Sequence, residues 1–297
     1  MKPAPFEYIR PRSKREALEH LQRGGQDLKV LAGGQSLVPL FNMRLAEPAR
    51  VMDINGLQEL SSVHYEAANR TVAIGALTRH QQLMRDPVIQ EHLPMLAEAA
   101  KLIGHLAIRT QGTFGGSLVH ADPAAELPMM VAMLRGVFEV ESFEGARQIS
   151  SEDFFLGFYM TDLQPEELVV SVTVPVPDKP AGYAIREFSR RHGDFAIAAA
   201  AAVVQTDPKG RIIHAALGVG GLDSRGVSCP DLESALVGAS TPREFRAVAE
   251  RLADTIDPAE DVQASAEFRR HLGVELLAES IEAAHWNATR VRKEATE

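Results

Sequence analysis

The sequence contains a single cysteine, Cys229, among 297 residues. One thiol cannot close an intrachain disulfide, and it cannot supply the four ligands that an iron–sulfur cluster usually takes. Any such cluster that works with this chain must therefore be held by another chain. Cys229 precedes Pro230 in a turn-like stretch, and we interpret it as an incidental thiol.

Basic residues are also scarce, because 31 Lys and Arg face 40 Asp and Glu and leave a formal net charge of -9. A nucleic-acid surface needs clustered Lys and Arg, so this balance argues against a nucleic-acid partner. The longest apolar run, residues 195–204, is about half of the roughly 20 residues that a membrane-spanning helix requires. The N-terminus is broken by Pro3, Pro5 and Pro11 and lacks the apolar segment of a secretory signal. We therefore predict no membrane insertion and a cytoplasmic location.

Several motifs of catalysis and binding are missing as well. The 10 histidines form no H-E-x-x-H or comparable pair, so no metal site is predicted. Neither the P-loop pattern G-x-x-x-x-G-K-[ST] nor the Rossmann pattern G-x-G-x-x-G occurs. Gly218-Val219-Gly220-Gly221 comes nearest, but Asp223 takes the place of the third glycine, and the segment fits a strand end and turn. The G-x-S-x-G elbow of serine hydrolases is absent too.

The chain does have the length and composition for two domains, with 45% hydrophobic and 24% charged residues. Residues 1–56 alternate strand and helix patterns, which predicts a small βαβ lobe with a parallel sheet. Residues 57–177 predict a second lobe, a mixed sheet with helices. Three prolines in Pro175-Val176-Pro177-Asp178-Lys179-Pro180 indicate a linker, so we place a domain boundary after residue 177.

The predicted fold class is α+β: a two-lobed first domain (residues 1–177), followed by a C-terminal domain of antiparallel sheet and helices (residues 178–297). The alanine-rich run in residues 195–204 is ambiguous, since alanine favours helices. The turn Asp207-Pro208-Lys209-Gly210 that follows it is typical of a hairpin, and we favour a strand.

A first glycine loop, Ala32-Gly33-Gly34-Gln35-Ser36, follows a predicted buried strand (residues 29–32) and precedes a short helix. Glycines let the backbone approach a phosphate closely, successive N–H groups form a concave nest, and Ser36 adds a hydroxyl donor. The pattern predicts an anion site. Taken alone, a Gly-Gly turn between strand and helix is more often only a turn.

A second loop, Thr113-Phe114-Gly115-Gly116-Ser117, repeats this pattern, and two such nests suit two phosphates. It leads through His120 and Asp122 into a helix predicted over residues 124–133. Asp122 is expected to be the N-cap, with Pro123 at the first helical position, and Glu126 is expected to face the same cleft. For His120 a structural, hydrogen-bonded role is favoured over a ligand role.

With both loops in view, the chain resembles the FAD-binding medium subunit of the carbon monoxide dehydrogenase and xanthine dehydrogenase family, the molybdenum hydroxylases. Each short motif is modest evidence, but the ordered set covers nearly the whole chain. The resemblance rests on Ala32-Gly-Gly-Gln-Ser36, Asp53-Ile-Asn55, Ile108-Arg-Thr-Gln-Gly-Thr-Phe-Gly-Gly-Ser117, His120-Ala-Asp-Pro-Ala-Ala-Glu-Leu-Pro128, Ser189-Arg-Arg-His-Gly-Asp-Phe-Ala196 and Gly218-Val-Gly-Gly221.

The resemblance implies a non-covalent FAD whose pyrophosphate is held by the two loops, with Ile103 beside the isoalloxazine ring. Gln35 stands where some relatives have His, which matters little if the backbone binds the phosphate. For Val169 and Arg186 the alternatives of a plain strand residue and a surface base stay open. The implied cofactor-binding residues are Ala32, Gly33, Gly34, Gln35, Ser36, Leu37, Ile103, Thr113, Gly115, Gly116, Ser117, Asp122, Glu126, Val169 and Arg186.

By the same resemblance, a molybdopterin large subunit oxidises substrate, and an iron–sulfur small subunit passes the electrons to FAD and on to an external acceptor. The expected assembly is a dimer of heterotrimers, and no catalytic acid, base or nucleophile need lie on this chain. One alternative is a self-contained FAD-dependent oxidase or reductase of the same fold group. Another is a scaffold without cofactor, against which the intact glycines of both loops speak.

Overall fold

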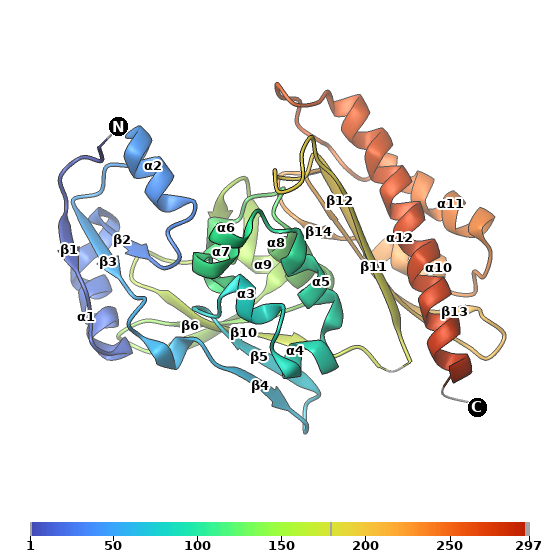
Figure 1. The fold of residues 1–297 in the computed structure, drawn as a ribbon, viewed down its shortest axis with the longest axis horizontal. Coiled ribbons are helices and arrows are strands. Elements are labelled where there is room, and N and C mark those ends of the chain that lie inside the picture. The colour runs from blue at the N-terminus through green and yellow to red at the C-terminus, as the bar shows by residue number, and fades with distance from the viewer. Residues whose placement is uncertain (1, 179, 295–297) are drawn as a thin grey trace.

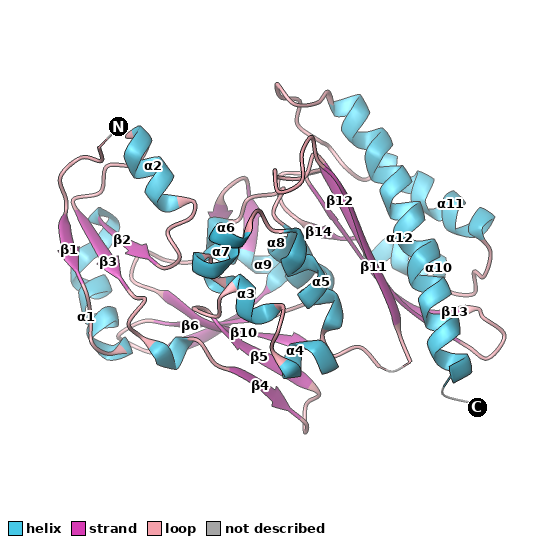
Figure 2. Ribbon diagram, in the orientation of Figure 1, coloured by secondary structure: helices cyan, strands magenta, loops and turns pink. Residues whose placement is uncertain are grey.

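The computed structural model describes residues 2–178 and 180–294, so Lys179 in the predicted linker and residues 1 and 295–297 lie outside it. Within these residues the chain forms a three-stranded, a five-stranded and a four-stranded sheet and one two-stranded ribbon. Figures 1 and 2 show the three larger sheets following one another along the long axis, in the order of the sequence. The predicted α+β fold class is confirmed.

The N-terminal lobe is the predicted βαβ unit. Its elements are β1 (Glu7–Ile9), α1 (Lys14–Gly24), the 3-10 turn η1 (Gly25–Asp27), β2 (Leu28–Leu31), α2 (Leu37–Met43) and β3 (Arg50–Asp53). The strands are parallel and lie in the order β1-β3-β2. Ser13 caps α1 by accepting a hydrogen bond from the N–H of Glu16 at 3.2 Å, and Gly25 ends the helix with a φ of 52°.

The middle lobe is built on the five-stranded sheet. Its elements are η2 (Gln58–Leu60), β4 (Val63–Glu66), β5 (Thr71–Gly75), α3 (His80–Leu83), α4 (Pro87–His92), α5 (Pro94–Leu102), α6 (Leu106–Gln111), α7 (Phe114–His120), α8 (Glu126–Met133), β6 (Val137–Glu141), β7 (Ala146–Ser150), α9 (Ser151–Phe154), β8 (Phe155–Gly157), β9 (Met160–Thr161) and β10 (Leu168–Pro175). The sheet order is β4-β5-β10-β6-β7. Expected to be mixed, it pairs antiparallel throughout, because short hairpins join β4 to β5 and β6 to β7.

The core of the middle lobe determines where α8 lies. Phe138 stacks on Phe154 with ring centroids 3.6 Å apart, and Phe155 meets both rings edge-on. All residues of α8 are buried against this core and the following domain. A helix that is apolar on every side must be covered on every side. Glu126, its first residue, is therefore buried along with it, at 5% exposure.

The C-terminal domain is a four-stranded antiparallel sheet with helices. Its elements are β11 (Gly182–Phe188), β12 (Ala198–Thr206), β13 (Ile212–Gly220), β14 (Val227–Ser228), α10 (Pro230–Leu236), α11 (Pro242–Glu250), η3 (Arg251–Asp254) and α12 (Ala266–Glu294). The strand order is β11-β12-β13-β14. Helix α12 runs along one face (Figure 1), while α5 and α8 of the middle lobe contact strands of the sheet.

The alanine-rich run is β12, as favoured from the sequence. Ala198, Ala200 and Ala202 belong to the core that includes Leu277 and Ile281 of α12. The intervening Ala199 and Ala201 belong to the core of the middle lobe. Because side chains alternate between the two faces of a strand, small residues allow helices to approach both faces. Packing therefore overrides the helical propensity of alanine.

Two local expectations change. Asp122 is not the N-cap of the helix and Pro123 is not its first residue, since α8 begins at Glu126 with Ala125 as N-cap. Asp122 instead accepts a hydrogen bond from the N–H of Ala124 at 2.9 Å and shapes the turn before α8. Cys229 precedes α10 and is buried, and burial raises the pKa of its thiol to about 12. Across the helices of the described residues, none is both long and apolar enough to span a bilayer.

Candidate functional site

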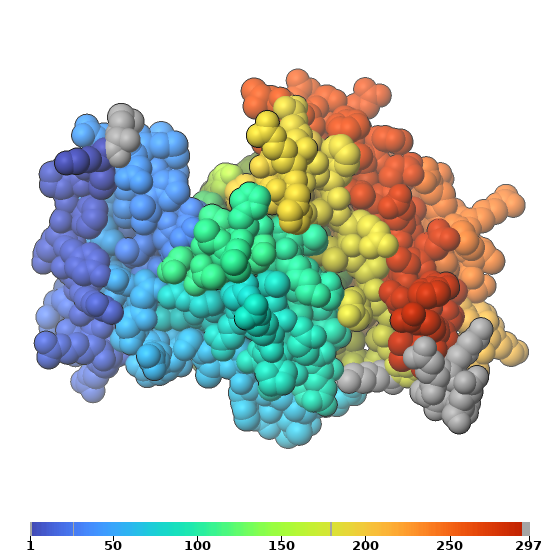
Figure 3. Space-filling model, viewed as in Figure 1, coloured from blue at the N-terminus to red at the C-terminus, as the bar shows by residue number. Residues whose placement is uncertain are grey.

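The two glycine loops come from different lobes and lie side by side. The first (residues 32–36) joins β2 to α2, and the second (residues 113–117) opens α7. A Cβ added to Gly33 would stand 2.5 Å from the carbonyl oxygen of Gln111 and 2.8 Å from the Cα of Gly112. A Cβ added to Gly116 would lie 3.8 Å from the Cβ of Ala32. Figure 3 shows a notch in the outline between the blue N-terminal lobe and the green and yellow segments beyond it.

The first loop offers free backbone donors. Within residues 2–178 and 180–294, the N–H groups of Gly33, Gly34, Gln35 and Ser36 have no acceptor. Gly34 turns the chain with a φ of 71°, and the side chain of Gln35 folds back to donate to the carbonyl oxygen of Gly33 at 3.0 Å. The loop therefore meets a ligand through its main chain, which fits an anion.

The second loop uses its backbone donors to hold itself in place. Phe114 and Gly115 donate to the carbonyl oxygens of Thr78 and Ala76, each at 2.8 Å. Gly116 donates to the Thr113 hydroxyl at 3.2 Å, and Ser117 donates to the Thr113 carbonyl oxygen at 3.0 Å. The expectation of a second nest of free N–H groups is therefore wrong. Its glycines serve close packing, and the Ser117 hydroxyl has no partner among the described residues.

A polar bridge that the sequence did not reveal joins the loops. The Asn55 side-chain amide donates to the carbonyl oxygen of Ala32 at 2.7 Å. Arg79, just before α3, donates from one nitrogen to the Asn55 side-chain oxygen at 2.6 Å and from another to the carbonyl oxygen of Gln111. Asn55 lay inside a motif used for the resemblance. Arg79 had no signal, because its role depends on which segments meet in space.

His80 fixes the start of the second loop. Its Nε2 lies 3.0 Å from the carbonyl oxygen of Thr113, so Nε2 carries the proton and donates. The backbone N–H of the same residue donates to the carbonyl oxygen of Gly112 at 3.1 Å. Burial lowers the pKa of the imidazole to about 4, so His80 is neutral near pH 7.

Two carboxyl groups, those of the buried Glu126 on α8 and the half-buried Glu187 on β11, lie near enough for the charge of one to act on the other. The pKa of Glu126 is raised to about 8, mainly by burial and also by the nearby charges of Glu187 and Asp122. Glu187, on β11, has its own pKa raised to about 7 by burial, and its Oε2 has no hydrogen-bond partner among the described residues. Sequence patterns did not point to Glu187. Near pH 7, Glu126 is mainly a neutral acid that can donate a hydrogen bond.

The remaining predicted site residues lie in different environments, from the hydrophobic core to the surface. Ile103 is half-buried after α5, and Arg109 holds its carbonyl oxygen at 2.9 Å. The Val169 side chain belongs to the core of the middle lobe. Arg186 is exposed on β11 and donates to the carbonyl oxygen of Ile185 at 2.9 Å. Among the described residues, no three His, Cys, Asp or Glu side chains are grouped so as to hold a metal ion.

Known proteins share this arrangement along nearly the whole chain. Residues 4–177 match the model of the FAD binding domain in molybdopterin dehydrogenase. Residues 183–284 match the model of the CO dehydrogenase flavoprotein C-terminal domain. The two matches meet between β10 and β11, where the chain passes from the second sheet to the third.

Individual relatives agree with the family models. The 6-hydroxypseudooxynicotine dehydrogenase complex subunit alpha of Paenarthrobacter nicotinovorans is 40% identical over 270 residues, 91% of this chain and 90% of that protein. The carbon monoxide dehydrogenase medium chain of Hydrogenophaga pseudoflava is 34% identical over 285 residues, 96% of this chain and 98% of that one. A solved structure of carbon monoxide dehydrogenase from Hydrogenophaga pseudoflava that lacks the Mo-pyranopterin moiety matches with a TM-score of 0.93, at 34% identity, over 97% of this chain and 99% of that chain. The chain therefore belongs to the family of FAD-binding medium subunits of molybdenum hydroxylases, and it is an oxidoreductase subunit.

Proposed function

We propose that this chain binds FAD non-covalently and passes electrons from iron–sulfur clusters on a partner subunit to an external acceptor. The observation that carries the proposal is the row of free N–H groups from Gly33 to Ser36, beside the second glycine loop. Backbone N–H groups that lack a partner are costly unless water or a ligand satisfies them. A diphosphate satisfies several of them at once.

The site residues then have different roles in the proposed binding of FAD. The backbone of residues 33–36 binds the diphosphate, and the glycines of the second loop permit the close approach of the two loops. The Ser117 hydroxyl is a further donor. The neutral Glu126 offers a hydrogen-bond donor, and no full negative charge, at the start of α8. We propose Leu37 and Ile103 as apolar contacts that exclude water. When bound, FAD supplies a centre that can hold one or two electrons.

For Val169 and Arg186 the structure favours the simpler alternatives. Val169 turns its side chain into the core of the middle lobe. Arg186 lies on the exposed part of β11. We assign neither of them a separate role in cofactor binding.

The proposed partners are an iron–sulfur small subunit and a molybdopterin large subunit, in a dimer of heterotrimers. Two observations support them. The relatives are named as one subunit or chain of a dehydrogenase, and a single buried cysteine cannot supply the ligands of a cluster.

The test compares the full-length chain alone with the complex purified from its native source. The chain alone is expected to retain flavin by absorbance but to show no flavin reduction when substrates of the complex are added without air. In the complex, the same substrates should reduce the flavin. Folded protein that neither retains nor rebinds FAD would contradict the proposal. Direct reduction in the isolated chain would favour a self-contained oxidase or reductase.

A further inference from the structure

Arg79 is a partly buried cation, and the acidic group whose charge reaches it, Asp53, is already hydrogen-bonded to Tyr8 and Asn55. Within the described chain it makes no ion pair, and its two hydrogen bonds go to neutral oxygens, those of the Asn55 side chain and the Gln111 backbone. Burial is also the leading cause that lowers its pKa. A charge withdrawn from water without a direct ion pair is costly, and a bound anion would stabilise it.

The guanidinium has donors to spare at this position. It carries five N–H groups in a planar fork, of which two are used. The two acceptors of the Arg79 guanidinium lie on segments next to the two glycine loops. The Asn55 side chain donates to Ala32 of the first loop, and Gln111 lies two residues before the second loop. Guanidinium geometry matches phosphate oxygens, which accept two parallel hydrogen bonds.

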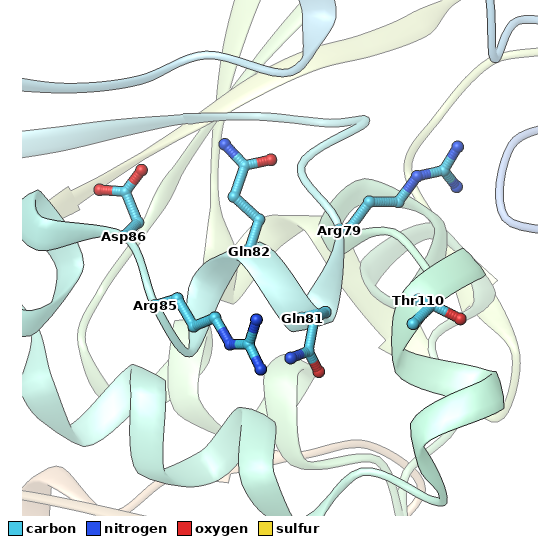
Figure 4. Close-up of a pocket in the computed structure, with 6 residues that line it drawn as sticks. All are labelled: Arg79, Gln81, Gln82, Arg85, Asp86 and Thr110. Atoms are coloured by element: carbon cyan, nitrogen blue, oxygen red, sulfur yellow. The ribbon is translucent and has the colours of Figure 1, made fainter.

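A second arginine on the same surface gives a useful contrast. Arg79 and Arg85 both line an open surface pocket, together with Gln81, Gln82, Asp86 and Thr110 (Figure 4). In the figure the Arg79 side chain extends away from Gln82 and Asp86, whereas Arg85 points toward Gln81. Arg85 is exposed and, within the described residues, makes no hydrogen bond or ion pair with either glycine loop. The two side chains carry the same charge and line the same pocket, but only Arg79 is hydrogen-bonded to segments next to the glycine loops.

We propose that Arg79 is the cation that neutralises the cofactor diphosphate and, through Asn55 and Gln111, sets the spacing of the two glycine loops. The inference rests on the proposed function, since it assumes that the loops hold FAD. It adds a charged side chain to a site otherwise formed by main-chain donors. It also separates recognition of the phosphates from recognition of the flavin ring.

The test uses the full-length chain freed of flavin and three ligands. FAD has both ring and diphosphate, ADP has the diphosphate alone, and riboflavin has the ring without phosphate. The variants are Arg79→Gln and the matched control Arg85→Gln, which removes an equal charge from the same pocket. We expect Arg79→Gln to weaken FAD and ADP by about 10- to 100-fold, as for loss of a hydrogen bond to a charged group, with riboflavin unchanged. Arg85→Gln should leave all three dissociation constants within about twofold of the unaltered chain.

A second variant keeps the test open if Arg79→Gln does not fold. Asn55→Asp has nearly the same shape and gives Arg79 a carboxylate partner, so it too should weaken ADP more than riboflavin. Equal weakening of all three ligands would mean that Arg79 only supports the fold and would overturn the inference. So would unchanged FAD and ADP binding in Arg79→Gln. Failure of the proposed function looks different, because the unaltered chain would then bind no FAD.

Discussion

Gly33 and Gln111 approach so closely that only a hydrogen atom fits between them on the glycine side, since a Cβ on Gly33 would stand 2.5 Å from the Gln111 carbonyl oxygen. Gly33→Ala should therefore push the loops apart and weaken FAD binding about 5- to 150-fold, because overpacking costs about 1–3 kcal/mol. Titration of the flavin-free chain measures the effect. Gly145→Ala is the control, because a Cβ there meets nothing within 4 Å. Equal affinity in the two variants would show that the loop spacing does not matter for binding.

The buried carboxyl group of Glu126 should make the folded state less stable as the pH rises. Its pKa is about 8 in the folded chain and 4.5 for an ordinary glutamate, so between these values the folded state holds a proton that the unfolded state has lost. The free energy of unfolding then falls by up to ~1.4 kcal/mol per pH unit from this group. Glu126→Gln should flatten the fall, and Glu260→Gln, at an exposed position, should not. Urea unfolding between pH 5 and pH 8 measures both slopes, and identical slopes would refute the assignment.

The buried His80 should make the folded state less stable as the pH falls, the opposite of the effect of Glu126. Its pKa is lowered from 6.5 to about 4 by burial, so below pH 6.5 the unfolded state takes up a proton that the folded state refuses. Stability is therefore lost as the pH falls from 6.5 toward 4, by up to ~1.4 kcal/mol per pH unit. His80→Gln can still donate to Thr113 but cannot titrate.

The measurement is the difference in unfolding free energy between pH 5 and pH 7. It should shrink in His80→Gln and stay the same in His64→Gln, because His64 is exposed on β4. A difference that stays unchanged in His80→Gln would mean that the imidazole is not shielded from protons.

Gly182 should tolerate no side chain. A Cβ at this position would stand 2.1 Å from the carbonyl oxygen of Ala284 and 2.2 Å from the backbone nitrogen of Ala288, both on α12. Helix backbone cannot yield as a flexible side chain can, so Gly182→Ala should lower the free energy of unfolding by about 3 kcal/mol or more. Gly157→Ala meets nothing within 4 Å and serves as the control in the same urea titration. Near-equal midpoints would contradict the tight contact of β11 with α12.

The fold followed from patterns that are local in the chain, and the same patterns marked the two loops of the candidate site. Strand and helix alternation gave the N-terminal lobe, and the two Gly-Gly turns marked segments that meet. Local patterns do not show which backbone donors the fold itself uses. The second loop looked like a second nest, but Thr78 and Ala76, on a different segment, accept its first two hydrogen bonds. Arg79 and Glu187 were missed for the same reason, since each acquires its role only from residues distant in sequence.

The alternation of alanines along β12 places one strand in two hydrophobic cores. Neither half of the protein then has a complete hydrophobic core by itself. Removing the middle lobe would expose a row of alanine methyl groups on the third sheet to water. After cleavage of the chain between β10 and β11, the two fragments should therefore remain associated. Fragments produced separately should be poorly soluble, and their solubility should be restored when they are mixed.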